Sequence, residues 1–216
     1  MDEPFGLRLD RPAPTRKGER TREAILNDAI SLASQVGLEG LSIGSLATRT
    51  GLSKSGLFAH FGSKEDLQLA TLDRASSLFQ DKVIKPAAMF PRGVGRLRAL
   101  LEFWLRWVDG SDDIPGGCVL IQAASEYDDR PGSVRDQLAR DQRELRGSVA
   151  KTVKIAIDAG ELDADIDPWQ FTFEFIGIVL AAYQEIRLLE DRRATERALR
   201  AFDRLIVKRI EPLNRA

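Results

Sequence analysis

Basic and hydroxyl side chains that can bind phosphate or base edges are concentrated in one part of this 216-residue chain. Between residues 15 and 64 there are seven basic and four acidic residues, whereas the whole chain carries a formal net charge of -1. The overall charge argues weakly against nucleic-acid binding, but a positive segment on a neutral-to-acidic protein suits contact with phosphate through one face. The candidate contacts are Arg16, Lys17, Arg20, Ser42, Arg49, Ser53, Lys54, Ser55, Gly56, Phe58, His60 and Lys64.

Residues for catalysis or metal binding are few. His60 is the only histidine, and no cluster of Cys, Asp or Glu accompanies it, so we assign it to backbone phosphate contact or to a structural role. The adjacent carboxylates at residues 112–113 and 128–129 fall in expected loops with no histidine nearby. An all-α enzyme is therefore an alternative that finds no support in these residues, and we predict no catalytic residue, no metal ligand and no cofactor.

The single cysteine, Cys118, leaves a different alternative open, a thiol-redox regulator. A helix N-terminus can activate a thiol, but the chain has no second cysteine to resolve an oxidised one. One cysteine also fits a reducing compartment. The first residues lack the basic and apolar regions of a signal peptide, and no apolar run is long enough to cross a membrane. We expect a cytoplasmic protein with no membrane partner.

Two short helices joined by a tight turn, about residues 42–61, must position most of the polar candidates. Ser42 and Ser53 are N-cap candidates, Gly51 stands at the break where a positive φ is needed, and Ala47 allows close approach. The inward positions fit helical spacing and are Ile43, Leu46, Leu57 and Phe61. This pattern predicts a helix-turn-helix, whose second helix enters the major groove of DNA.

The stretch after Gly56 resembles the TetR family of bacterial transcriptional regulators. The family's recognition helix ends in the form L-Y-x-H-F, followed by x-S/N-K-E-x-L, and here the matching residues are Leu57, Phe58, His60, Phe61, Ser63, Lys64, Glu65 and Leu67. Phe58 departs from the pattern, since a Tyr hydroxyl at that position could bond a phosphate. A second stretch, 116–135, is similar to GGC-(apolar)-E-x-D-D-R-P-G-x-V-R in several TetR-like proteins.

The resemblance implies an all-α fold of about nine helices, with a three-helix DNA-binding head and a helical ligand-binding and dimerisation body. We expect a flexible arm over 1–18, the head over 19–79 and the body over 80–216. The implied partners are a double-stranded DNA operator with palindromic sequence, a second copy bound through the last two helices, and an unknown small-molecule effector. The implied function is ligand-responsive repression.

Helical spacing and breakers place the remaining elements. We expect a first helix from Thr21, a fourth from Lys64 toward Val83 broken by Pro86, and further helices over 94–108, 118–124, 134–159, 168–186 and 194–210. The dense apolar residues of the last two helices favour burial in a dimer over burial within one subunit. An effector pocket is predicted from aromatic richness, with an ordinary packed core as the alternative, and its lining would be Phe103, Trp104, Trp107, Cys118, Ile121, Gln122, Phe171, Phe175 and Tyr183.

Overall fold

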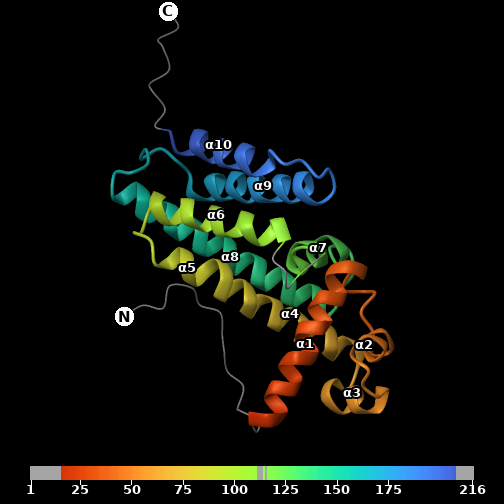
Figure 1. Cartoon of the computed structure of the whole chain (residues 1–216). Helices are drawn as coiled ribbons and strands as arrows, with labels where there is room; N and C mark the ends of the chain where they lie inside the picture. Colours follow the sequence, from red (N-terminus) through yellow and green to blue (C-terminus); the bar gives the residue numbers. More distant parts are fainter. Residues whose placement is uncertain (1–15, 111–113, 115, 208–216) are drawn as a thin grey trace, which may run out of the picture. The chain divides into compact units, whose positions relative to one another are not determined.

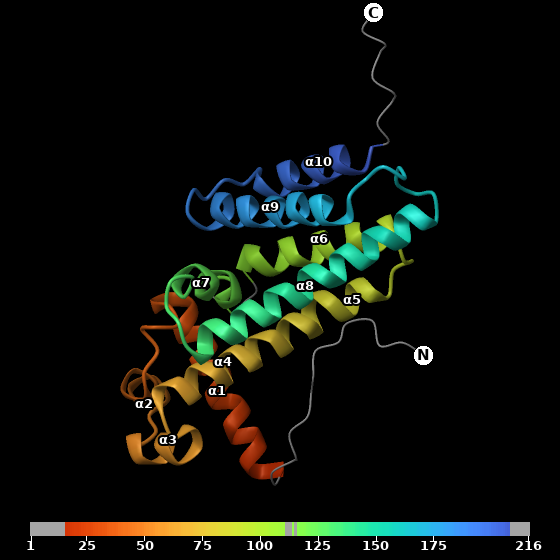
Figure 2. The same cartoon turned by 180° about the vertical axis from the view of Figure 1, so that it is seen from behind.

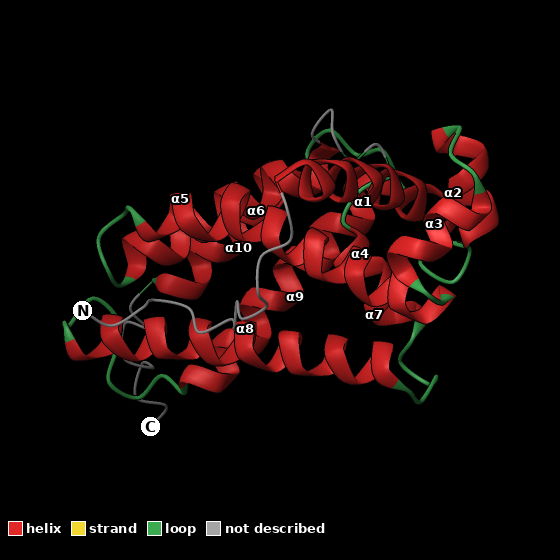
Figure 3. Ribbon diagram, turned by 90° about the horizontal axis from the view of Figure 1, so that it is seen from below, coloured by secondary structure: helices red, strands yellow, loops and turns green. Residues whose placement is uncertain are grey.

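The computed structural model describes residues 16–110, 114 and 116–207, with the backbone alone for 16–19. These residues form helices and loops only (Figure 3). The helices are α1 (Arg16–Val36), α2 (Ile43–Thr50), α3 (Lys54–Phe61), α4 (Lys64–Phe79), α5 (Lys85–Ala88), α6 (Val94–Gly110), α7 (Val119–Glu126), α8 (Ser133–Asp158), α9 (Pro168–Arg187) and α10 (Ala194–Ile206), with a π-helical segment, Gln80–Ile84, between α4 and α5 (Figure 1). Since α4, the π-helical segment and α5 are continuous, the described chain has nine separate helices, and the predicted all-α class is confirmed.

The described chain divides into two compact units. We call the described residues of 6–81 and 110–143 the head unit, and those of 82–109 and 144–207 the body unit. The head unit therefore includes α7 and the start of α8 in addition to α1–α4. The domain boundaries proposed from the sequence, at 18/19 and 79/80, stay predictions.

The core of the head unit follows from the apolar stripe of α1. Helix α1 contacts α2, α4 and α7, and α3 contacts α2 and α4. The α1 side chains on the contact face are buried at helical spacing, and they are Ile25, Leu26, Ala29, Ile30 and Ala33. Leu46 and Leu57 from the two short helices are fully buried as well, so the apolar positions predicted for the helix-turn-helix do face inward.

Helix α1 begins at Arg16 and not at the expected Thr21. Residues 16–18, which we expected in a flexible arm, are therefore helical, and the rest of that arm lies outside the described residues. The earlier start is compatible with the sequence, because Glu19, Arg20 and Arg22 favour helix and no proline lies between residues 16 and 21.

The expected break at Pro86 is wrong. The helical path continues through Pro86 to Ala88 and ends at Met89, before Pro91. The π-helical segment Gln80–Ile84 directly precedes the proline, and its wider turn relieves the clash that the ring would make with the carbonyl four residues earlier. The predicted break at 90–93 stands, because the next helix begins at Val94.

In the body unit, α9 and α10 lie side by side (Figures 1 and 2). Asp167 caps α9 by accepting a hydrogen bond from the Trp169 N–H at 2.8 Å, with Pro168 in the first turn as predicted. The buried ring of Phe202 on α10 packs edge-on against Phe171 and Phe175 of α9 at centroid distances of 6.4 and 6.0 Å. Helix α10 ends at Ile206, whereas the predicted helix extended to residue 210. Residues 208–210 of that predicted range lie outside the described part of the chain. None of the helices described is long and apolar enough to span a bilayer.

Candidate nucleic-acid interface

Helix α3 exposes most of its residues to solvent because only two of its side chains point inward. Leu57 and Phe61 are buried, whereas the other α3 residues are exposed, and these are Lys54, Ser55, Gly56, Phe58, Ala59 and His60. Ser53 precedes them and caps the helix, since its Oγ accepts from the Gly56 N–H at 3.1 Å. The hydrophobic pattern thus sets which face of α3 is available for a ligand.

The turn between α2 and α3 is held by its glycine and by serine caps. Gly51 has φ +69°, a left-handed conformation that glycine adopts without strain, and its N–H bonds the Ala47 carbonyl at 3.0 Å. Ser42 forms a capping box with Ser45, in which each side chain accepts from the other residue's N–H, at 3.1 and 3.0 Å. Each cap of this kind contributes about 1 kcal/mol to helix stability.

The basic residues around α3 differ in whether they already bond other side chains of the protein. Lys54 is exposed and has no ion-pair partner in the part of the chain that the structure describes. Arg49 on α2 donates to Ser31 Oγ on α1 at 2.7 Å, so its guanidinium is held against α1. Arg20 is exposed on α1, while Arg16 and Lys17 belong to its first turn and their side chains lie outside the described structure.

Lys64, another candidate DNA contact, already forms an ion pair within the protein. Its Nζ lies 2.7 Å from Glu39 Oε1, in the turn between α1 and α2. The Lys64 hydrogen bond, followed by one from Tyr127, lowers the pKa of Glu39 below its usual value. A phosphate would therefore have to compete with the Glu39 carboxylate for Lys64.

Two residues near the interface were not predicted from the sequence. Arg22 on α1 lies over the Phe61 ring at 5.2 Å, a cation–π contact that fastens α1 to the end of α3. Glu39 binds Lys64 and also Arg130, whose Nη1 is 3.7 Å away. The spacing of 25 residues between Glu39 and Lys64 leaves no periodic signal, so only a structure could pair them.

The residues of the predicted effector pocket are divided between the two units. Cys118, Ile121 and Gln122 lie in the head unit, and the others lie in the body unit. Cys118 is only 1% exposed, so a dissolved oxidant does not reach its thiol in this conformation. Gln122 carries a buried Oε1 without a hydrogen-bond partner, although its Nε2 donates to the Gly116 carbonyl at 2.9 Å. The pocket as a whole stays a prediction.

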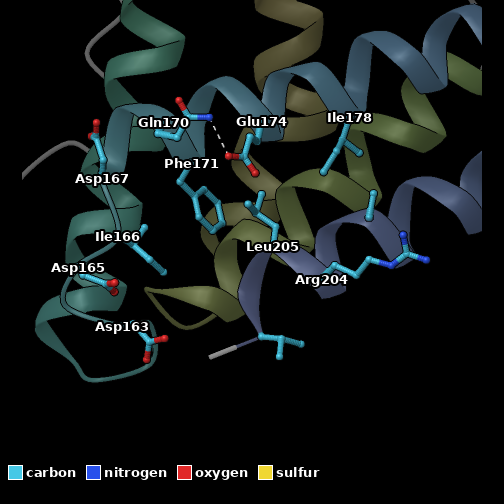
Figure 4. Close-up of a pocket in the computed structure, with 12 residues that line it drawn as sticks. Asp163, Asp165, Ile166, Asp167, Gln170, Phe171, Glu174, Ile178, Arg204 and Leu205 are labelled. Atoms are coloured by element: carbon cyan, nitrogen blue, oxygen red, sulfur yellow. Dashed lines mark hydrogen bonds between the residues drawn. The ribbon is translucent and has the colours of Figure 1, made fainter. Parts of the chain in front are cut away.

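A separate groove of about 500 Å³ opens in the body unit (Figure 4). It shares only Phe171 with the predicted pocket, and its other walls come from the α8–α9 loop, α9 and the end of α10. Asp163, Asp165 and Asp167 lie along one side, and Arg204 lies on the α10 side. Within the described residues, no group of three or more His, Cys, Asp and Glu side chains is arranged to hold a metal ion.

Comparison with known families matches most of the chain in two parts. Residues 25–71 match the model described as "Bacterial regulatory proteins, tetR family", and residues 93–202 match "Tetracyclin repressor-like, C-terminal domain". The first range contains the whole α2–α3 pair, and the second covers more than half of the 216 residues.

Individual proteins are similar to this chain in sequence and in fold. The chain is 30% identical over 119 residues to the HTH-type transcriptional repressor ComR of Escherichia coli K12, which covers 54% of this chain and 56% of that protein. The crystal structure of a TetR transcriptional regulator from Chloroflexus aurantiacus superposes with a TM-score of 0.81 at 28% identity, covering 89% of this chain and 96% of that one. The crystal structure of AibR with isovaleryl coenzyme A and operator DNA shares the fold, with a TM-score of 0.70 at 24% identity over 86% and 97% of the two chains.

Proposed function

The chain belongs to the TetR family and is a DNA-binding transcriptional regulator without enzymatic activity, and on that premise we propose that it is a homodimeric, ligand-responsive repressor of a palindromic operator. The observation that carries the proposal is the solvent-exposed face of α3, with Lys54 and Ser55 in its first turn. Residues near the N-terminus of a recognition helix are the ones that reach base edges in the major groove.

Dimerisation is supported by an exposed apolar stripe on α9. Trp169 and Phe173 are 60% and 75% exposed, Leu180 is exposed too, and the spacing of these residues places them on one side of the helix. Large apolar side chains gathered on one face mark an interaction surface. Gly177 has open space around it, which would let a partner helix approach closely. Selectivity also favours a two-fold dimer, because one short helix reads few bases and two such helices read a palindrome.

Effector binding is supported by Gln122 in the head unit. A buried polar atom without a partner is rare in folded proteins, and the Gln122 Oε1 is one. This oxygen is already desolvated by folding, so a ligand donor group that bonds it would incur only the donor's own desolvation cost. AibR, which has the same fold, was crystallised with an acyl-coenzyme A and with DNA, and this supports the coexistence of both activities on such a scaffold. Repression follows if the effector-free form binds the operator and blocks transcription, in the bacterial cytoplasm where the DNA is.

Footprinting on the DNA upstream of its own coding sequence tests the proposal. We expect protection of two inverted half-sites whose centres are about one or two helical turns apart, since a two-fold dimer places its two α3 helices at that spacing. Protection of one half-site, or of a site without inverted symmetry, would contradict the dimeric reader. A titration at two salt concentrations, run on the same fragment, checks that phosphate contacts contribute to binding.

A further inference from the structure

The turn between α1 and α2 is held by side chains from α7. Both carboxylate oxygens of Glu126 accept hydrogen bonds from this turn: Oε2 from the Leu38 N–H at 2.8 Å, and Oε1 from the Glu39 N–H at 3.0 Å. Hydrogen bonds to an ionised carboxylate are stronger than neutral ones. Glu126 is the last residue of α7, so the end of that helix is bonded directly to the backbone that leads into α2.

A second set of bonds completes this attachment. The side chain of Gln68 on α4 is 4% exposed, and its Nε2 donates to the Leu38 carbonyl and to Tyr127 Oη, both at 2.9 Å. The Tyr127 hydroxyl donates in turn to Glu39 Oε2 at 2.8 Å. Burial, followed by the bond to Glu39, raises the pKa of Tyr127, so the hydroxyl remains a donor. We call Gln68, Glu126 and Tyr127 the clasp, and Leu38–Glu39 the clasped turn.

Gly37, immediately before the clasped turn, fits this arrangement in two ways. Its φ of +80° is left-handed, and a Cβ at this position would lie 2.8 Å from Glu126 Oε1. Any other residue would be strained and would push the carboxylate away from the turn. The backbone here is thus shaped to receive the Glu126 side chain.

The start of the α7 region is bonded to α1 as well. The Gly116 N–H donates to Ser34 Oγ at 3.0 Å, and Gln122 Nε2 bonds the Gly116 and Ser34 carbonyls at 2.9 and 3.3 Å. Helix α7 is therefore fixed at both ends to the last part of α1 and the turn that follows it. A shift of α7 cannot leave the clasped turn where it is unless these bonds break.

The clasped turn reaches the DNA-facing surface through Glu39. Its carboxylate pairs with Lys64, which begins the helix directly after α3, and with Arg130 beyond the end of α7. We propose that Glu126 and Tyr127 are positioning residues, which transmit the placement of α7 to α2, α3 and Lys64 through the clasped turn. The inference rests on the proposed function, and it gives effector binding near Gln122 a physical route to the DNA-reading helices within the head unit.

The substitution that tests this inference is Glu126→Gln. The amide keeps the shape but has one acceptor oxygen, and its NH₂ would face an N–H of the turn. We expect hydrogen exchange at the Leu38 and Glu39 amides to accelerate about tenfold or more, with exchange in α9 and α10 unchanged. We expect affinity for the footprinted operator to fall about tenfold while affinity for random-sequence DNA stays the same, because only the specific complex needs both heads correctly placed. Asp129→Asn is the matched control, since it removes one exposed carboxylate of the following loop, whose oxygens make no described bond to the turn.

The outcomes distinguish failure of this inference from failure of the proposed function. Wild-type operator affinity in Glu126→Gln, or an equal loss for operator and random DNA, would overturn the inference alone. If Glu126→Gln does not fold, Tyr127→Phe replaces it, because that substitution removes only the hydroxyl that bonds Glu39 and Gln68, and the same ratio of specific to random-DNA affinity decides. Failure of the wild-type protein to protect any operator would overturn the proposed function, and this inference with it.

Discussion

Replacing Phe173 with glutamate should convert the proposed dimer into monomers. Phe173 is 75% exposed on α9, and burying such a ring against a partner contributes about 1.5–3 kcal/mol. The two-fold axis doubles every change, so the substitution should cost about 3–6 kcal/mol, before the cost of burying two carboxylates. This corresponds to a weakening of dimerisation by about two to four powers of ten. Sedimentation equilibrium over a range of protein concentrations measures the shift directly.

Met89→Glu is the control for this experiment. Met89 is 86% exposed at the end of α5, so the change adds the same charge to an exposed apolar position outside α9 and α10. It should leave the association constant unaltered. Operator binding by Phe173→Glu should weaken by about 10²–10⁴, because separate monomers lose the effective concentration that links the two heads. A fully dimeric Phe173→Glu protein would place the interface elsewhere.

Gly116→Ala should strongly destabilise the head unit. A Cβ at residue 116 would lie 1.8 Å from the Ser34 carbonyl oxygen and 2.1 Å from its carbon. Both atoms are backbone, so no side-chain rotation can relieve the overlap, and the loop before α7 must move away from α1. The hydrogen bond from Gly116 N–H to Ser34 Oγ would break as well. We expect a loss of about 3 kcal/mol or more in the free energy of unfolding, measured by urea titration.

Gly147→Ala supplies the opposite expectation with the same chemical change. Gly147 lies within α8, and no neighbouring atom lies within 4 Å of its built Cβ. Alanine there should stabilise the helix by about 0.5–1 kcal/mol, since glycine has the greater freedom to lose on folding. Equal stability of Gly116→Ala and wild type would show that the loop before α7 does not rest on α1.

Local signals in the sequence predicted the short helices α2 and α3 and the turn between them. Ser42 and Ser53 each cap the helix that we expected, and Gly51 has the predicted positive φ. These features depend on residues within four positions of each other, where spacing alone is informative. The start of α1 and the effect of Pro86 were missed for the opposite reason. Whether Pro86 ends the helix depends on whether the turn before it can widen, which a single-residue rule for breakers does not include. The first residue of a helix is uncertain by one or more positions in any such rule.

Long-range polar contacts left no readable pattern. The bonds from Glu126 and Tyr127 to the clasped turn join residues 87 or 88 apart, and the sequence showed only that 116–135 resembles a stretch found in related proteins. The effector pocket expected from aromatic richness stays a prediction. Phe171 and Phe175, expected in its lining, pack against Phe202 in the described structure, and Phe171 also lines the groove in the body unit. Composition cannot separate a cavity wall from a packed core, because both are apolar.

The central claim, that α3 of a dimer reads operator DNA, is tested most directly by operator binding of Lys54→Ala as a function of salt. Lys54 is exposed in the first turn of α3 and has no ion-pair partner among the residues described. Its loss should weaken operator binding by about 10–100-fold and, if it contacts a phosphate, reduce the magnitude of the salt slope by about 1 for each subunit. Lys151→Ala, which removes an exposed lysine of α8, should bind as wild type does. Equal operator affinity and equal salt slope for Lys54→Ala and Lys151→Ala would contradict the claim.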